Sequence, residues 1–558
     1  MTLSKTSLKI AFAQLNCVVG DIEGNVSRIF SAYEDAKKQK ADLIVFPELF
    51  LTGYPPEDLV LKPAFQKAAQ DAIKNIARHL SPSTSILLGT IWPEDGVVYN
   101  AVVLLEEGDV RAVRKKVELP NYGVFDELRV FSGGPLPSPI DIKGVRIGVP
   151  ICEDIWKDQV VECLNECGAE ILIALNGSPF DWPKPDQRMN VCVARVTESK
   201  LPLAYINLVG GQDELVFDGA SFVLNNDCTL ALQMPAWEES LILTEWTCEN
   251  KEWRCLKADC SVLPVGEAAA YSACILGLRD YVNKNGFPGV VLGLSGGVDS
   301  ALVAVMAADA LGPERVHAIM LPYHYTSKES LEDASLCAQA LGIRYNVVSI
   351  IEPVESFRKA LSHILQGVPS DSTEENIQSR VRGTSLMAIS NKLGLMVLTT
   401  GNKSEMSVGY ATLYGDMNGG FNPIKDLYKG EVYKLARWRN ENVPKISKCS
   451  CTEAIPERIF TKPPSAELRP NQKDQDSLPP YDILDDILLC LIEKEMSVKE
   501  IVTRGHRKET VEKVERLLYL AEYKRRQAAP GVKISSRNFG RDRRYPITNL
   551  FREKNQLR

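Results

Sequence analysis

The sequence lacks the two features that would direct the chain into or across a membrane. No apolar run is long enough to span a bilayer, and the polar residues 1–9 lead into a strand-like run without an export signal. These absences favour a cytoplasmic protein with no membrane partner.

Spacings typical of metal or disulfide frameworks are also missing. The chain has 14 cysteines, but Cys449 and Cys451 are separated by one residue, and no cysteine has a histidine at ligand spacing. Without an export signal, these thiols are expected to be reduced. The five histidines lie in unrelated contexts, so no Ser-His-Asp arrangement is predicted.

An excess of positive charge is absent too. The 65 Lys and Arg residues are outnumbered by 72 Asp and Glu residues, which gives a net charge of −7. This balance argues against a general nucleic-acid binder. The basic C-terminal segment, with Arg537, Arg543 and Arg544, is interpreted as a solvated or interface segment.

What is present is the composition of a large globular protein. The 558 residues are 45% hydrophobic and 25% charged, enough for two or three domains. Residues 247–262 are polar and show no sustained period, so we expect irregular structure there. The boundary is placed at this segment, which predicts one domain over residues 1–262 and another over 263–558.

The first domain alternates short β-branched runs with helical patterns, which predicts a mixed α/β sandwich. Strands are expected over residues 9–17, 41–46, 85–92, 101–105, 145–151, 170–175 and 203–208. Helices are expected over residues 25–40 and 65–80.

The second domain opens with a strand, a Gly-Gly turn and a helix at residues 290–311. Such a turn presents backbone N–H groups to a phosphate, although an ordinary tight βα turn is the commoner meaning of two glycines. The loop has no Gly-Lys-Ser/Thr and is therefore not a Walker A loop. Its Asp299 is explicable if Mg²⁺ accompanies the phosphates. The βα order continues to residue 400 and predicts a parallel doubly wound sheet.

Three reactive side chains follow predicted strands of the first domain: Glu48, Lys116 and Cys152. A buried charge is costly to desolvate, so Glu48 is either solvated at a sheet edge or kept for chemistry. Lys116 taken alone is typical of a surface lysine, and most cysteines such as Cys152 are structural. The residues themselves leave both interpretations open.

The sequence around each of the three, such as Val-Phe-Pro-Glu-Leu and Pro-Ile-Cys-Glu-Asp, resembles the nitrilase superfamily. The resemblance implies an α/β/β/α sandwich with Glu48 as general base, Cys152 as nucleophile and Lys116 as the cation that stabilises the oxyanion. The segments at residues 119–127 and 176–180 are similar to the glutamine-hydrolysing branch of that superfamily. That similarity implies a glutamine site formed by Tyr122, Glu127, Ser178 and Lys184.

The string Ser-Gly-Gly-Val-Asp-Ser resembles the pyrophosphate-binding loop of the ATP pyrophosphatase superfamily. Its members split ATP to AMP and pyrophosphate while they adenylate a substrate oxygen. The resemblance implies an ATP-binding loop over residues 293–300, and Thr400 on a later strand. The implied ATP-binding residues are Gly293, Leu294, Ser295, Gly296, Gly297, Val298, Asp299, Ser300 and Thr400.

Further segments resemble NAD synthetases, among them Thr-Gly-Asn-Lys-Ser-Glu at residues 400–405. A capped helix start would look similar. The resemblance implies that Asp299 and Glu405 hold Mg²⁺. It also implies a deamido-NAD⁺ site formed by Asn376, Arg380, Glu405 and Lys524.

Taken over nearly the whole chain, the motifs resemble the glutamine-dependent NAD⁺ synthetase family. The resemblance implies that ATP, deamido-NAD⁺ and L-glutamine or ammonia are substrates, that ammonia passes between two sites, and that the chain is a homo-oligomer, at least a dimer through the second domain. Two alternatives are another glutamine-fed adenylating amidotransferase and a nucleotide-sensing module with an inert nitrilase-like half.

Overall fold

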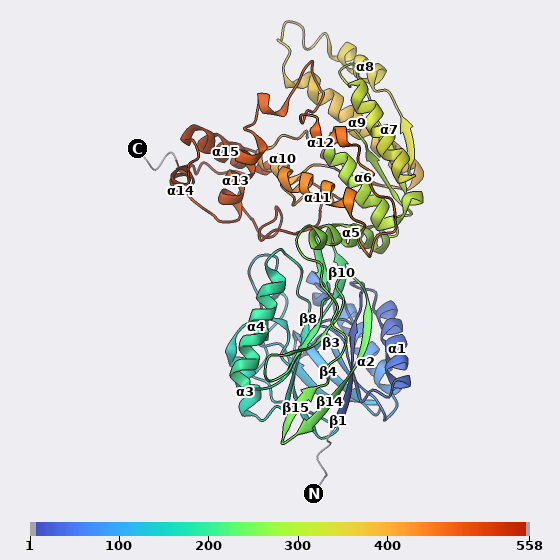
Figure 1. Cartoon of the computed structure of the whole chain (residues 1–558), viewed down its shortest axis with the longest axis vertical. Coiled ribbons are helices and arrows are strands. Elements are labelled where there is room, and N and C mark those ends of the chain that lie inside the picture. Colours follow the sequence, from blue (N-terminus) through green and yellow to red (C-terminus); the bar gives the residue numbers. More distant parts are fainter. Residues whose placement is uncertain (1–6, 554–558) are drawn as a thin grey trace. The chain divides into compact units, whose positions relative to one another are not determined.

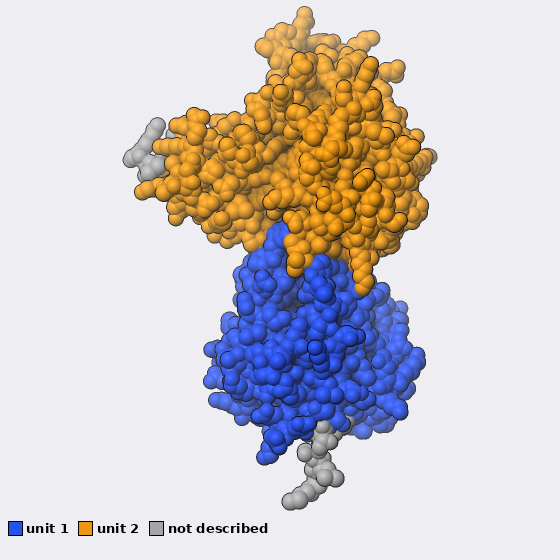
Figure 2. Space-filling view, in the orientation of Figure 1, with its two compact units in different colours: residues 1–264 blue, residues 265–558 orange. Residues whose placement is uncertain are grey.

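The computed structural model describes residues 7–553. It divides into two compact units, residues 1–264 and 265–558, which Figure 2 colours separately. The division falls beside the boundary placed at residue 262 from the sequence. Among the described residues, no helix is both long and apolar enough to cross a membrane.

The first unit contains a mixed seven-stranded sheet in the order β15-β14-β1-β2-β3-β4-β5. Strands β1, β2 and β3 run parallel, and the remaining pairs are antiparallel. The strands are β1 Ser7–Gln14, β2 Leu43–Val45, β3 Ser85–Glu94, β4 Val97–Glu106, β5 Asp109–Lys115, β14 Ser240–Glu249 and β15 Glu252–Cys255.

A second sheet of six strands lies in the order β13-β12-β9-β8-β7-β6, and β10 and β11 form a separate hairpin. The strands are β6 Ile140–Ile142, β7 Val145–Gly148, β8 Ile171–Asn176, β9 Leu203–Asn207, β10 Val209–Gln212, β11 Leu215–Asp218, β12 Phe222–Leu224 and β13 Leu230–Gln233. The helices of this unit are α1 Ile22–Lys38, α2 Pro63–Arg78, α3 Asp158–Glu166 and α4 Lys184–Ser199.

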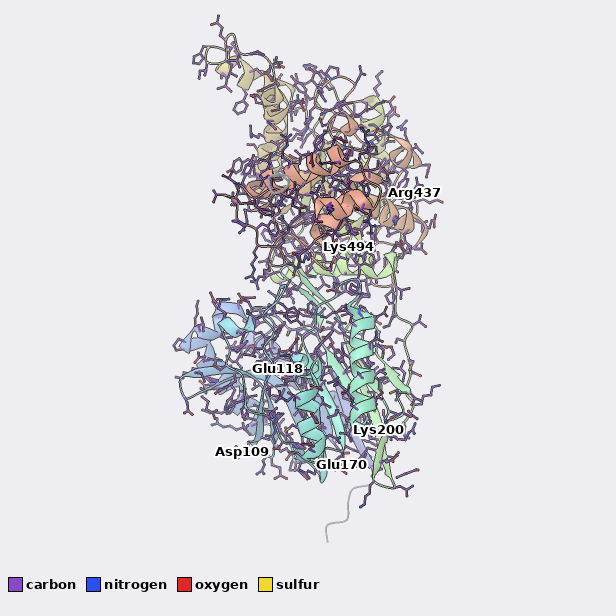
Figure 3. The ribbon with its side chains drawn as sticks, turned by 90° about the vertical axis from the view of Figure 1, so that its left-hand side faces the viewer. Asp109, Glu118, Glu170, Lys200, Arg437 and Lys494 are labelled. Carbon is purple, nitrogen blue, oxygen red and sulfur yellow. The ribbon has the colours of Figure 1, made fainter. Side chains whose placement is uncertain are left out.

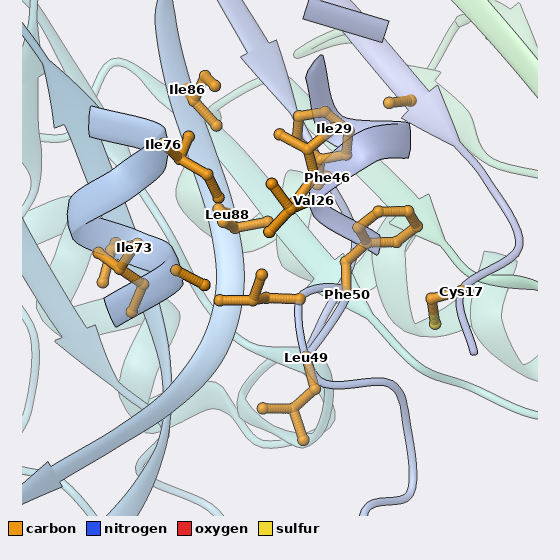
Figure 4. Packing of buried hydrophobic residues seen from close by; sticks show 14 of the residues in the cluster. Cys17, Val26, Ile29, Phe46, Leu49, Phe50, Ile73, Ile76, Ile86 and Leu88 are labelled. Carbon is orange, nitrogen blue, oxygen red and sulfur yellow. The ribbon is translucent and has the colours of Figure 1, made fainter. Parts of the chain in front are cut away.

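The alternation of side chains along the strands produces four layers (Figure 1). On β1, Leu8 and Ile10 point into the core between the two sheets, whereas Ala11 and Ala13 point to the side covered by α1 and α2. Figure 4 shows that side, where α1 and α2 bury their apolar stripes on the sheet. Helices α3 and α4 cover the outer face of the second sheet. The predicted α/β/β/α sandwich is therefore confirmed.

The second unit contains a four-stranded sheet, all parallel, in the order β18-β17-β16-β19. The strands are β16 Val290–Gly293, β17 Val316–Met320, β18 Arg344–Val347 and β19 Met396–Leu398. The chain order reverses between β16 and β19, and the crevice at the carboxyl ends of such strands is where ligands bind in doubly wound folds. The predicted parallel doubly wound sheet is confirmed.

Helices cover both faces of this sheet and extend into a further helical cluster. One face of the sheet packs on α8 and α9 through Val291, Ile319 and Val397. Helices α6 and α7 also contact the strands of the sheet. Helices α10, α13, α14 and α15 share a separate apolar core. The helices are α5 Glu267–Lys284, α6 Val298–Leu311, α7 Lys328–Leu341, α8 Ile351–Leu361, α9 Ser372–Leu393, α10 Lys403–Val408, α11 Lys429–Glu441, α12 Glu457–Thr461, α13 Tyr481–Ile492, α14 Val498–Thr503, α15 Lys508–Leu520 and α16 Glu522–Arg525.

The expectation of irregular structure over residues 247–262 is wrong for residues 247–255, whereas residues 256–262 form no helix or strand. Strand β14 continues to Glu249, and β15 folds back on it as a hairpin. Trp253 is buried, and its indole N–H donates to Glu170, which is labelled in Figure 3. Trp246 and Trp253, which stand among polar residues, were therefore the sequence signal of a half-buried hairpin. Each strand of such a hairpin has one face on the core and one in water.

The basic C-terminal segment is also more structured than expected. Arg543 is buried and paired with Glu522 of α16, so this residue is not solvated. The 14 cysteines are all free thiols, as the sequence predicted.

Candidate active sites

The three reactive side chains of the first unit all follow strands and are all buried. Glu48 comes shortly after β2, Lys116 directly after β5, and Cys152 opens a short 3₁₀ turn after β7. Glu48 and Lys116 have no exposed surface, and Cys152 is 4% exposed. The surface interpretations of Glu48 and Lys116 are therefore excluded.

Glu48 is fixed by three donors. Its Oε1 accepts from Lys116 Nζ at 2.7 Å and from Asn100 Nδ2 at 2.7 Å, and its Oε2 accepts from the backbone N–H of Gly177 at 2.7 Å. These bonds from three different segments hold the Glu48 carboxylate in one position.

Lys116 lies between two carboxylates. Its Nζ is 2.7 Å from Glu48 and 2.9 Å from Glu127, and Tyr54 donates its hydroxyl to Glu127 at 2.9 Å. Burial disfavours the ammonium, but Glu127 and Glu48 outweigh it and raise the pKa of Lys116. Burial also raises the pKa of Glu127 to about 7, against the effect of Lys116 and with that of Glu48. The lysine is thus a fixed cation.

Cys152 is held in an uncommon backbone conformation beside these charges. Its φ is +46°, in the left-handed region that non-glycine residues rarely adopt. Burial raises the pKa of the thiol, the Glu48 carboxylate adds to the effect, and Lys116 opposes it. The resting sulfur is a thiol, so it needs a base to become a nucleophile.

The residues expected to bind glutamine lie on segments flanking these side chains. Tyr122 is half exposed and donates its hydroxyl to Glu153, next to Cys152. Ser178 is buried and follows Gly177, the residue that binds Glu48. The ammonium of Lys184 lies 4.3 Å from the centre of the Trp156 ring.

The second unit contains a cavity of about 510 Å³ at the carboxyl ends of β16 and β19. Residues 293–300 line it together with Thr400, so the loop and the later threonine expected to bind ATP meet in one place. Gly296 has a φ of +79°, and a Cβ there would lie 2.4 Å from the carbonyl oxygen of Ser330. Only glycine allows this loop to approach α7 so closely.

Asp299 and Glu405 converge on one cationic side chain. Lys429 Nζ lies 2.5 Å from Asp299 and 3.4 Å from Glu405, and Asn402 donates to Asp299 at 2.8 Å. Burial raises the pKa of Glu405, and Lys429 opposes the shift. Lys429 was not predicted from the sequence. The two acids that it contacts lie more than twenty residues away along the chain, so only the folded structure shows that they meet.

Three further residues were expected to bind deamido-NAD⁺. Asn376 and Lys524 line the same cavity, where Asn376 accepts from Thr412 and Lys524 donates to the backbone of Gly409 and Ala411. Arg380 is not among the lining residues and donates to the backbone of Leu413 instead.

A strap of residues 462–480 runs along the cavity. Glu467 is its anchor: its Oε1 accepts from Ser327, Ser330 and Lys462 at 2.8, 2.8 and 2.7 Å. Burial would raise the pKa of Glu467, but these donors outweigh it and lower the pKa. Residues 462–468 thereby contribute to the lining of the cavity.

The acids present fit a magnesium ion that is completed by substrate. No group of three or more His, Cys, Asp or Glu side chains that could hold a metal occurs among the described residues. Asp299 and Glu405 nevertheless direct hard oxygen ligands at one point, which Lys429 contacts. Mg²⁺ is commonly bound by one or two carboxylates together with phosphate oxygens and water.

Fold and site together define a two-part enzyme class: a thiol-dependent carbon-nitrogen hydrolase of nitrilase-like fold joined to a nucleotide-binding synthase. The carbon-nitrogen hydrolase family matches residues 9–252, and the NAD synthase family matches residues 270–528.

Relatives match the chain over its full length. Glutamine-dependent NAD(+) synthetase from Rhodobacter capsulatus is 49% identical over 98% of this chain and 99% of its own. The solved structure of glutamine-dependent NAD⁺ synthetase from Acinetobacter baumannii, in complex with adenosine diphosphate, is 43% identical with a TM-score of 0.78, over 97% of this chain and 99% of that one. The Cytophaga hutchinsonii enzyme shares the fold with a TM-score of 0.82, at 24% identity over 98% of both chains. The chain belongs to the glutamine-dependent NAD⁺ synthetase family.

Proposed function

We propose that the chain converts deamido-NAD⁺, ATP, L-glutamine and water to NAD⁺, AMP, pyrophosphate and L-glutamate. The observation that carries this proposal is the buried ammonium of Lys116, held between Glu48 and Glu127 beside the Cys152 thiol. Such an arrangement can cleave an amide, and the chain joins it to a unit with a phosphate-binding loop.

In the first unit, Glu48 takes the proton of Cys152 and the sulfur attacks the glutamine carboxamide. The ammonium of Lys116 stabilises the oxyanion, and Glu48 gives its proton to the amide nitrogen, so that ammonia leaves as the thioester forms. Water then hydrolyses the thioester to glutamate, with Glu48 as base. Tyr122, Glu127, Ser178 and Lys184 hold the substrate in this proposal.

In the second unit, the backbone of residues 293–300 holds the phosphates of ATP, with Thr400 alongside. Asn376, Arg380, Glu405 and Lys524 orient deamido-NAD⁺ so that its nicotinate carboxylate meets the α-phosphate. The carboxylate is adenylated, pyrophosphate leaves, and ammonia displaces AMP. Positioning is the main contribution of the protein here, because ammonia is already a nucleophile.

Asp299 and Glu405 would hold Mg²⁺, which when bound neutralises charge on the phosphates. Lys429 contacts both acids and lines the same cavity, where its ammonium would add a further positive charge beside the phosphates.

Ammonia is proposed to pass directly from one site to the other. At neutral pH free ammonia is mostly protonated and loses its nucleophilic lone pair, so a route shielded from water would preserve it. The protein is proposed to be cytoplasmic and a homo-oligomer, at least a dimer through the second unit. Exposed apolar residues support an oligomer: Val347 at the end of edge strand β18, and Phe357, Ile364 and Val368 in and after α8.

Replacing the nucleophile tests the division of labour. Cys152→Ala should abolish NAD⁺ synthesis from glutamine and leave synthesis from ammonia within about twofold, because no atom of the second unit changes. NAD⁺ is measured with each nitrogen donor and deamido-NAD⁺ as acceptor. Cys192→Ala, which removes a buried thiol of α4, is the matched control and should keep both activities. Equal loss of both activities in a folded Cys152→Ala variant would contradict the proposal.

A further inference from the structure

The carboxylate of Asp154 joins the two segments that carry the nucleophile and the oxyanion cation. Its Oδ1 accepts from the backbone N–H groups of Val117 and Glu118 at 3.0 and 2.8 Å, and its Oδ2 accepts from that of Ile151 at 3.0 Å. Val117 directly follows Lys116, and Ile151 directly precedes Cys152. One side chain therefore ties both catalytic residues at adjacent peptide groups.

These bonds are made where they are hard to replace. Asp154 is 1% exposed, so water cannot substitute as acceptor for the three N–H groups. Charge-assisted bonds from backbone N–H groups to a carboxylate are also stronger than neutral ones. Burial raises the pKa of Asp154 to about 6, with the backbone donors opposing the shift, so the group is mostly ionised at neutral pH.

The backbone that Asp154 holds is the strained one. Cys152 has its φ of +46° in the turn that Asp154 closes, because Asp154 also donates its own N–H to the carbonyl of Ile151. A left-handed conformation at a non-glycine residue persists only where the surroundings impose it. The bond of Asp154 to Ile151 supplies that constraint on the turn, and its bonds to Val117 and Glu118 fix the position of Lys116.

We propose that Asp154 is a positioning residue for amide cleavage, which sets the thiol of Cys152 against the ammonium of Lys116. It touches neither substrate nor the reacting atoms and acts through the backbone of both segments. The inference rests on the proposed glutaminase activity and adds to it a residue for which no role was predicted from the sequence.

The Asp154→Asn substitution separates this role from simple packing. The amide keeps nearly the same volume, but only its oxygen can accept, so either the Ile151 N–H or the Val117 and Glu118 N–H groups face an NH₂ donor. One segment loses its anchor while the core stays filled. A misplacement of about 1 Å can lower a rate by about a hundredfold.

The experiment compares the full-length wild type, Asp154→Asn and a control, Asn225→Leu. Asn225 is also buried and binds backbone, through Cys255 of β15, and none of its contacts within residues 7–553 is to Glu48, Lys116 or Cys152. Four quantities are measured: kcat and KM for glutamine hydrolysis, the rate of Cys152 alkylation by iodoacetamide, Tm, and NAD⁺ synthesis from ammonia. Alkylation is assigned to Cys152 by peptide mass.

We expect Asp154→Asn to lower kcat by about ten- to a hundredfold with KM within about threefold, to change the alkylation rate by at least about fivefold, and to leave ammonia-dependent synthesis intact. Asn225→Leu should lower Tm by a similar amount yet keep kcat and alkylation within about twofold. The inference is overturned if Asp154→Asn keeps both rates within twofold, or if both variants lose kcat in proportion to their Tm. A wild type that is alkylated but does not hydrolyse glutamine would instead refute the proposed function.

Discussion

At the scale of single residues, the first site depends on keeping a lysine charged where no water reaches it. Taking an ammonium out of water costs several kcal/mol, and two carboxylates within 3 Å offset that cost for Lys116. The same arrangement keeps the cation in place before substrate arrives, so little reorganisation is needed as the oxyanion forms.

Removing this charge should affect both catalysis and stability. In Lys116→Met, glutamine hydrolysis should fall by about 10²- to 10³-fold, because the oxyanion loses its cation. The free energy of unfolding should fall by about 3–5 kcal/mol, since two buried carboxylates lose their partner. Both are measured on one preparation, by ammonia release and urea unfolding.

The matched control is Lys38→Met, which breaks an exposed pair with Asp35 on α1. It should leave both stability and glutamine hydrolysis close to those of the wild type, because solvent screens an exposed pair. A Lys116→Met variant that remains as active as the control would rule out an electrostatic role for this lysine.

Glu127 should make glutamine hydrolysis sensitive to pH. With a pKa of about 7, this carboxyl group is increasingly protonated below neutrality and then no longer pairs with Lys116. We expect kcat/KM for glutamine to fall as pH decreases through about 7, and this acid limb to be lost in Glu127→Gln. Because the folded-state pKa lies above the unfolded value of about 4.5, the contribution of Glu127 to stability has the opposite trend: it is fully present below pH 4.5 and is lost as pH rises through 7. An unchanged acid limb in Glu127→Gln would assign the titration to another group.

Residue types and motifs were enough to predict Glu48, Lys116 and Cys152, but not the groups that support them. Asn100, Tyr54 and Asp154 are ordinary residues in sequence, and their importance depends on which buried atoms they reach. Asp154 was visible only as an acid beside the cysteine. A pattern along the chain cannot show that it binds a backbone segment more than thirty residues away.

At the scale of elements, the nucleotide cavity combines a rigid loop with an anchored strap. The loop of residues 293–300 is fixed between β16 and α6, and its Gly296 packs against α7. The strap reaches the same helix through Glu467, whose carboxylate accepts from the two serines of the first turn of α7 and from Lys462. A second bond, from Gln378 to the carbonyl of Leu468 at 2.9 Å, ties the neighbouring strap residue to α9.

Neutralising that carboxylate should loosen the strap. In Glu467→Gln the bonds from Ser327 and Ser330, which tie the strap to α7, lose their charge assistance, worth about 1 kcal/mol each, so the open population should rise by at least about tenfold. Limited trypsin digestion after Lys473 measures the open population, because the Arg469–Pro470 bond resists trypsin, and ATP should restore protection. Glu457→Gln, at an exposed carboxylate of α12, is the control. Equal cleavage rates in both variants would show that Glu467 does not hold the strap.

The strands and helices that periodicity predicted are present with ends displaced by a few residues, but many others, among them β5, α3 and α4, were not predicted. Helix α6 is a clear case, because an alanine- and leucine-rich run stops at Gly312 and Pro313. The β14–β15 hairpin was missed because its two strands carry exposed charges on one face and tryptophans on the other, a pattern too short to establish a period.

At the scale of the whole molecule, two chemistries occur in separate units of one chain. The first unit has a buried thiol and a fixed cation, and the second has a cavity lined by the loop of residues 293–300, two acids and Lys429. The product of one reaction, ammonia, is the nucleophile of the other. Joining the two units in one chain is chemically useful if the ammonia is consumed before it is protonated in bulk water.

The most direct test follows the amide nitrogen of glutamine. The full-length protein is given amide-¹⁵N-glutamine, deamido-NAD⁺ and an excess of unlabelled ammonium, with and without ATP, and the NAD⁺ formed is analysed by mass. The account predicts that NAD⁺ forms only with ATP and that its carboxamide carries mainly ¹⁵N. Unlabelled NAD⁺, or a label no richer than that of the bulk ammonium, would contradict it.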